Sequence, residues 1–170
     1  MADERGRFVM RRPLRGFDPV RLRLTREGAK ISRAELARLT GVGPSTYSQW
    51  ELGTAYPRPD SLARCAFNLG INMDDLFVIP LDQAYLGDLR VRRGFLQKDL
   101  AERLGVSEQL VGSIERGQGG LSDELAERWA EALSHDLPFR DERRRDDPIA
   151  VEAVRAAYER VRNRKAHERP

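Results

Sequence analysis

The stretch Glu35–Glu51 reads ELARLTGVGPSTYSQWE, and Asp99–Glu115 repeats its pattern as DLAERLGVSEQLVGSIE. A shift of 64 residues aligns the two without a gap, and the match extends to both sides. Identical pairs are Leu22/Leu86, Arg26/Arg90, Leu36/Leu100, Ala37/Ala101, Gly41/Gly105, Val42/Val106, Glu51/Glu115, Gly53/Gly117, Arg64/Arg128, Ala66/Ala130 and Leu69/Leu133. A fixed period of this kind indicates a repeated structural unit. The repeat predicts one module from about Phe17 to Pro80 and a second from about Leu81 to Asp141.

The start and end signals inside each copy are those of short helices. Ser32 is a hydroxyl N-cap with Glu35 three residues later, which predicts a reciprocal capping box. Gly41 and its counterpart Gly105 supply the positive φ that a tight turn between two helices requires. The next helix begins at Pro44 in the first copy and is capped by Ser107 in the second.

Hydrophobic residues recur at helical spacing in the remaining segments. The helix after the glycine turn has an apolar face made by Tyr47 and Trp50, or by Val111 and Ile114. An opening helix carries Leu22 and Arg26. A fourth helix has a core stripe of Leu62, Cys65, Ala66 and Leu69, or of Leu125, Trp129, Ala130 and Leu133. We expect an all-helical fold.

The fifth element differs between the copies. Asn72–Phe77 is predicted to be a short fifth helix, whereas Pro138 interrupts the corresponding stretch of the second module. A separate C-terminal segment spans residues 142–170, in which Asp147 caps a helix that has Pro148 at its first position and continues to about Lys165. Its seam of Ala150, Val154, Ala157 and Val161 suits a homodimer contact or a strut on the protein's own body. The second module is another possible dimer contact.

The sequence contains no residue set or motif that indicates catalysis. Cys65 is the single cysteine, and with His135 and His167 it makes no zinc-ligand set. No phosphate-binding loop, nucleophile elbow or metalloprotease helix is present. We therefore expect no enzyme activity, no metal and no cofactor. Since the sequence shows neither a signal peptide nor a membrane span, we expect a cytoplasmic protein.

Charge is distributed unevenly along the chain. Residues 1–33 hold ten Lys/Arg against four Asp/Glu, residues 34–139 hold ten against sixteen, and residues 140–170 hold ten against seven. The basic arm of residues 1–16 suits either contact with DNA phosphates and a minor groove or a solvated surface. Its arginines are Arg5, Arg7, Arg11, Arg12 and Arg15.

The first copy resembles the Cro/C1-type (XRE) helix-turn-helix family in Glu35-Leu36-Ala37, Gly41-Val42, Trp50-Glu51 and Gly53, with Pro57 and Pro59 beyond. The second resembles it in Gln97-Lys98-Asp99-Leu100-Ala101, Gly105-Val106-Ser107 and Ile114-Glu115-Arg116-Gly117. The resemblance covers about Leu22–Phe77 and Leu86–Leu137. It implies two tandem five-helix modules whose third helix enters the major groove and whose second helix touches the DNA backbone. It also implies that Arg26 pairs with Glu51, and Arg90 with Glu115, as parts of the scaffold.

Carried over position by position, the resemblance implies a DNA-facing set in each module. In the first module the set is Arg33, Pro44, Ser45, Thr46 and Gln49. In the second it is Gln97, Glu108, Gln109, Leu110 and Ser113. Two departures are Arg33, where the family often has Gln, and Leu96, where it has a hydroxyl N-cap.

The second module is the less favourable DNA reader. Glu108 would repel phosphates unless it accepted a hydrogen bond from a cytosine amino group, and residues 81–139 hold seven Lys/Arg against eleven Asp/Glu. We expect the first module, helped by Arg11 and Arg12, to provide most of the binding to double-stranded DNA.

These features favour a bacterial sequence-specific transcriptional regulator. The alternative is a protein-interaction regulator, such as an antitoxin or a regulator of another regulator, that uses the same folds for protein contacts.

Overall fold

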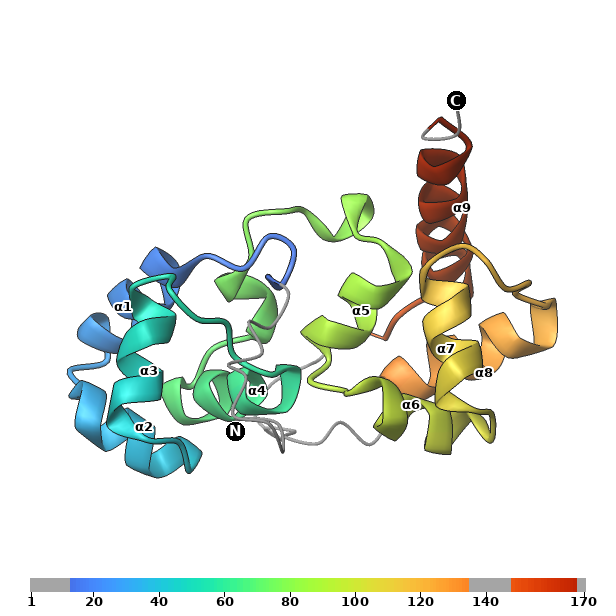
Figure 1. The fold of residues 1–170 in the computed structure, drawn as a ribbon. Helices are drawn as coiled ribbons and strands as arrows, with labels where there is room; N and C mark the ends of the chain where they lie inside the picture. The colour runs from blue at the N-terminus through green and yellow to red at the C-terminus, as the bar shows by residue number, and fades with distance from the viewer. Residues whose placement is uncertain (1–12, 135–147, 168–170) are drawn as a thin grey trace, which may run out of the picture.

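The computed structural model describes residues 13–134 and 148–167, and within these ranges the regular structure is helical (Figure 1). One isolated antiparallel bridge joins Phe17 and Phe77. The helices of the first half are α1 (Pro19–Gly28), α2 (Arg33–Thr40), α3 (Pro44–Glu51), α4 (Pro59–Leu69) and the 3-10 turn η1 (Met73–Leu76). Those of the second half are the 3-10 turn η2 (Leu81–Gln83), α5 (Leu86–Arg92), α6 (Gln97–Leu104), α7 (Glu108–Glu115), α8 (Asp123–Ser134) and α9 (Val151–His167). The expected all-helical architecture is confirmed.

Local signals account for most of the helix ends in the first half. Pro19 opens α1 behind Asp18, whose carboxylate accepts a hydrogen bond from the Val20 amide at 2.9 Å. Ser32 caps α2 by accepting from the Glu35 amide at 3.1 Å. The reciprocal half of the predicted capping box does not form, because the Glu35 carboxylate pairs with Arg38 at 2.7 Å instead.

The same helix ends recur in the second half with different chemistry. At the start of α6, the Asp99 carboxylate accepts from the Leu96 amide at 3.1 Å, so an acid three residues later partly replaces the absent hydroxyl cap. Ser107 caps α7, as predicted, by accepting from the Leu110 amide. Gly41 and Gly105 both adopt positive φ, at 69° and 61°. Both glycine turns therefore have the left-handed backbone conformation that the sequence predicted.

The buried side chains form two clusters, one in each half of the chain. The first lies among α1–α4 and η1 and contains Tyr47, Trp50 and Cys65. The second contains Trp129, which is fully buried, as Cys65 is in the first. No special role for Cys65 or Trp129 is needed to explain their positions, because both belong to the predicted core stripes.

α9 completes the second cluster, and this corrects two details of the sequence analysis. The helix begins at Val151 and not at Pro148, while Asp147 and Pro138 lie outside the described residues. Ala150 is exposed, whereas the rest of the predicted seam is buried against the second module: Val154, Ala157 and Val161, with Tyr158 alongside. The seam is thus a strut on the protein's own body.

The position of α9 is that of a fifth helix. In the first half, η1 contacts α1 and α4; in the second, α9 contacts their counterparts α5 and α8. The Tyr158 hydroxyl donates to the Gly119 carbonyl at 2.7 Å, and Arg160 Nε donates to the Ala84 carbonyl at 2.9 Å. A helix from the end of the chain therefore supplies the element that the repeat itself did not predict.

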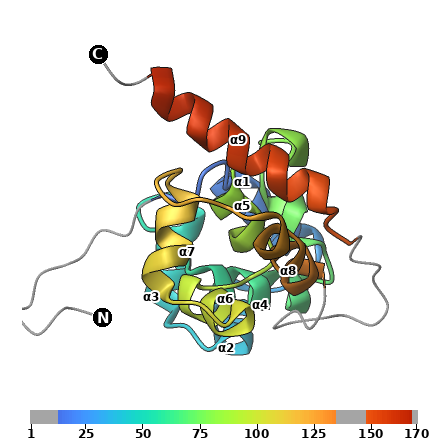
Figure 2. The same cartoon turned by 90° about the vertical axis from the view of Figure 1, so that its right-hand side faces the viewer.

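The two halves stand in a similar orientation. Figure 1 shows them side by side, and in Figure 2, which looks from the second half toward the first, corresponding helices occupy corresponding places. α7 and α3 lie on one side of that view, α8 and α4 on the other, and α6 and α2 at the bottom. One half is approximately a translated copy of the other.

Candidate nucleic-acid interface

α3 is anchored by one face and exposes the other. Tyr47 and Trp50 are buried, and their ring centroids lie 5.8 Å apart. Because a helix turns by 100° per residue, this anchoring leaves Pro44, Ser45 and Thr46 exposed at the helix start, with Gln49 half-buried one turn later. Hydroxyl and amide groups in such a row can donate to and accept from base edges.

A buried ion pair fixes the far end of α3. Arg26 on α1 donates from Nε and Nη2 to the two carboxylate oxygens of Glu51 at 2.6 and 3.0 Å. The side chains of Arg26 and Glu51 are 7% and 1% exposed. Arg26 also donates to the Ile31 carbonyl, so it joins α1, the turn before α2, and α3. The pair that the family resemblance implies is confirmed, and its two hydrogen bonds make it bidentate.

Arg33, at the start of α2, is the third member of this network. Its Nε donates to Glu51 at 2.8 Å, while half of its side chain is exposed. Burial alone would raise the pKa of Glu51, but the hydrogen bonds from Arg26 and Arg33 outweigh it, so the pKa lies below its ordinary value. Arg26 also pairs with Glu27 at 3.3 Å, so these four side chains carry no net charge together, and Arg33 is the half-exposed cation among them.

The second module repeats this network with a neutral side chain in place of Arg33. Arg90 donates to Glu115 at 2.6 and 3.1 Å and to the Phe95 carbonyl. Gln97 takes the place of Arg33 and donates to Glu115 at 2.8 Å. At this position the second module therefore lacks the half-exposed guanidinium group that Arg33 offers to a phosphate.

The exposed start of α7 differs from that of α3 as well. Val111 and Ile114 are buried, as predicted. Glu108, Gln109 and Leu110 are exposed, and Ser113 is half-buried. An acid and an aliphatic side chain thus stand where α3 presents small polar groups.

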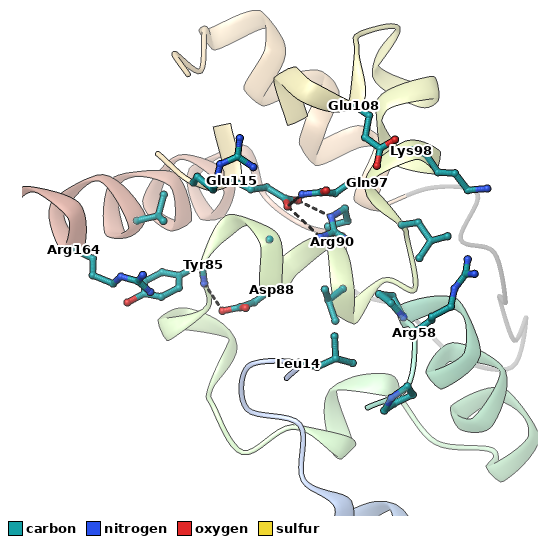
Figure 3. A pocket seen from close by; sticks show the side chains of 17 residues that line it. Leu14, Arg58, Tyr85, Asp88, Arg90, Gln97, Lys98, Glu108, Glu115 and Arg164 are labelled. Carbon is teal, nitrogen blue, oxygen red and sulfur yellow. Dashed lines mark hydrogen bonds and ion pairs between the residues drawn. The ribbon is translucent and has the colours of Figure 1, made fainter. Parts of the chain in front are cut away.

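A cleft of about 990 Å³ lies between the two modules and runs along the starts of α6 and α7 (Figure 3). Pro57, Arg58 and Pro59 of the first module form one wall, α5 lies along it, and Gln97, Lys98 and Glu108 stand on the side of the second module. In Figure 3, Lys98 and Glu108 lie at one end and Arg164 lies beside Tyr85 at the other. Residue-type patterns gave no signal for Arg58 or Lys98 as lining residues of a cleft, because a cleft between modules depends on how they pack.

The described part of the basic arm begins at Pro13, and the last arginine of the arm, Arg15, contacts the second module. Arg15 pairs with Asp88 at 2.5 Å and lies 4.0 Å above the centre of the Tyr85 ring. It therefore joins the arm to the second module, which neither interpretation of the arm anticipated. Arg11 and Arg12 lie outside the described residues.

Among residues 13–134 and 148–167, no cluster of three or more His, Cys, Asp or Glu side chains could hold a metal ion. Cys65 is buried, and burial raises the pKa of its thiol to about 12. In the same part of the chain, none of the helices combines the length and apolarity that a membrane crossing requires.

Comparison with known families agrees with this geometry. The family model described as helix-turn-helix matches the chain twice, over residues 22–76 and 86–135. The two matches lie on α1–η1 and on α5–α8. No curated protein and no solved structure matches the chain.

Proposed function

Since the chain belongs to the helix-turn-helix family of the Cro/C1 type, whose domains suggest DNA binding, we propose that it is a sequence-specific transcriptional regulator that reads the major groove with α3. The observation that carries the proposal is the exposed polar row at the start of α3, held by a buried face and by the Arg26–Glu51 pair. Preorganised side chains lose little entropy on binding.

The roles within the first module follow from position and charge. Ser45, Thr46 and Gln49 contact base edges. Pro44 lies at the start of α3, where the helix comes close to the DNA. Arg33 contacts a backbone phosphate, because it is a half-exposed cation at the start of α2. Arg11 and Arg12 add contacts that do not depend on sequence.

The second module contributes less to affinity. Gln97, Gln109 and Ser113 are its candidate contacts, with Leu110 beside them, but Glu108, and the neutral Gln97 in place of Arg33, weaken its attraction for phosphates.

The test is binding of the full chain to genomic DNA fragments across a range of salt concentrations, followed by footprinting. We expect Ser45→Ala combined with Gln49→Ala to reduce discrimination between specific and random DNA by about 1 to 3 kcal/mol for each base edge that is no longer read. Gln109→Ala combined with Ser113→Ala, the matched change in the second module, should cost less.

A different signature is expected from the arm. Arg11→Ala combined with Arg12→Ala should weaken binding to all sequences and reduce the salt slope by roughly one for each phosphate that is no longer neutralised. If the folded protein bound no fragment at any salt concentration, the protein-interaction alternative would replace this proposal.

A further inference from the structure

The contacts between the two modules are made by different surfaces on the two sides. Ala63, on α4 of the first module, faces Gly94 of the second, where an added Cβ would lie 2.7 Å from the Ala63 Cβ. Arg92 of α5 pairs with Asp74 at 3.3 Å, donates to the Ile79 carbonyl and lies 4.9 Å from the centre of the Phe77 ring. The α4–η1 side of one module thus meets the α5 side of the next.

A two-fold relation between the modules would require each contact to occur twice. Under the 64-residue shift, Gly94 corresponds to Lys30 and Ala63 to Glu127. A two-fold relation would therefore require a contact between Lys30 and Glu127 to match the one between Ala63 and Gly94. Lys30 and Glu127 are both exposed. The interface is therefore heterologous, or head-to-tail: two different surfaces meet, and the two modules keep the same orientation.

The predicted recognition helices follow this arrangement. α3 and α7 lie on the same side of the molecule in Figure 2, and in Figure 1 both run from the bottom of the view to the top. In a symmetric helix-turn-helix dimer the two recognition helices run in opposite directions, which is why its operator is a palindrome. Here the two helices are parallel.

The interface also holds this orientation in place. Gly94 has a φ of +78°, and its contact with Ala63 leaves no room for a side chain. Arg92 is buried at 5% exposure although it carries a charge, so its partners in the first module must stay in position. The Arg15–Asp88 pair adds a third connection.

We propose that one chain recognises a direct repeat: two DNA segments of the same polarity, with α3 on the first and α7 on the second. The inference rests on the proposed function, and it adds the geometry of the target. Because both helices face the same side, the two segments must be separated by a whole number of helical turns, about 10.5 base pairs or a multiple. The protein binds the segment under α3 more tightly than the segment under α7.

The test starts from selection of bound duplexes by the full chain from a pool with a long randomised region. The expected result is two motifs in the same orientation at one fixed spacing. Inverted motifs, or a single motif only, would overturn the direct repeat and leave the proposed function intact. Failure to enrich any sequence would instead remove the proposed function.

Synthetic duplexes then measure the contribution of orientation and phase. The direct repeat should bind on the order of 100-fold more tightly than a duplex with the first motif alone, because the second contact is intramolecular. Reversing the second motif, or inserting about 5 base pairs before it, should abolish this increase in affinity. Equal affinity for direct and reversed duplexes would contradict the proposal.

A protein variant outside the DNA-facing set tests the interface itself. Gly94→Lys gives the second module the residue that the first carries at the same backbone position, where Lys30 has a φ of 58°. It should keep affinity for the first motif and lose the preference for direct over reversed repeats. The matched control Lys30→Gly removes an exposed side chain and should leave that preference unchanged. The DNA-side measurements do not depend on whether Gly94→Lys folds.

Discussion

The pairs Arg26–Glu51 and Arg90–Glu115 show how single residues set the geometry of a predicted reading helix. Each pair joins the first helix of a module to the end of its third. Burying charges is costly unless they are fully hydrogen-bonded, and here the guanidinium groups also reach the Ile31 and Phe95 carbonyls. Such pairs fix position more than they add stability.

Removal of one partner should therefore destabilise its own module. We expect Arg26→Ala to lower the free energy of unfolding by on the order of 1 to 3 kcal/mol, because the Glu51 carboxylate is left without its bidentate partner while buried. Arg90→Ala should act likewise on the second module. Denaturation followed by circular dichroism measures the effect, and Arg38→Ala, which breaks an exposed pair, is the control. An unchanged melting curve together with abolished DNA binding would contradict the scaffold role.

The low pKa of Glu51 predicts a pH dependence. A carboxylate whose folded pKa is below its unfolded value stabilises the fold above the unfolded value, about 4.3, and loses that contribution as the pH falls through the folded one. The stability difference between the natural protein and Glu51→Gln should thus be full at pH 6 and shrink as the pH falls below about 4. Chemical denaturation at several pH values measures it. A difference that stayed constant with pH would show that the pKa of Glu51 does not change on folding.

Among the helices, α9 shows most clearly that an element's role depends on what covers it. Its periodicity suited two uses, and the structure buries its apolar stripe against α5, α7 and α8. Gly117 lies against this helix near Arg162, and its φ of +67° is a conformation that favours glycine. The C-terminal helix is thus part of the second core.

A cavity in this stripe should weaken the second module. Val154 is fully buried, and Val154→Ala should lower the free energy of unfolding by about 1 to 3 kcal/mol, because the surrounding core cannot close around the space of the missing methyl groups. The exposed position Ala156→Ser is the control. The effect should not depend on protein concentration. Melting that rose with concentration in the natural protein, and no longer did so in the variant, would indicate that the stripe joins two chains.

For the molecule as a whole, the head-to-tail interface decides what the two modules can do together. It buries Arg92 and leaves both modules with their predicted DNA-facing helices on one side. A rigid pair of this kind binds two segments at one spacing, whereas flexibly linked modules would accept many.

The same interface should couple the unfolding of the two modules. We expect the natural protein to unfold in one calorimetric transition and Arg92→Ala to unfold in two, because an alanine side chain cannot reach Asp74, Ile79 and Phe77. Lys98→Ala, at an exposed position on α6, should leave the single transition intact. Two transitions in the natural protein would show that the modules are independent, and they would remove the rigid arrangement that a fixed spacing needs.

The sequence by itself determined the helices and the turns of each module, and its family resemblance indicated the internal pairs. Gly41, Gly105 and Ser107 act within a few residues of their own positions, and a 64-residue repeat with helical periodicity leaves little choice of fold. The DNA-facing residues remain predictions, carried over from the family by position. Local signals failed where a competing neighbour was present, as when Arg38 took the Glu35 carboxylate from its capping box.

Only the tertiary structure decided which surfaces meet. The docking of α9, the pairing of Arg15 with Asp88 and the contact between Ala63 and Gly94 join residues far apart in the chain. No periodicity encodes such contacts, because they depend on the three-dimensional packing of complete helices. The repeat breaks where the interface lies, with Gly94 against Lys30 and Ala63 against Glu127, and the physical reason for those differences becomes visible once the modules are packed together.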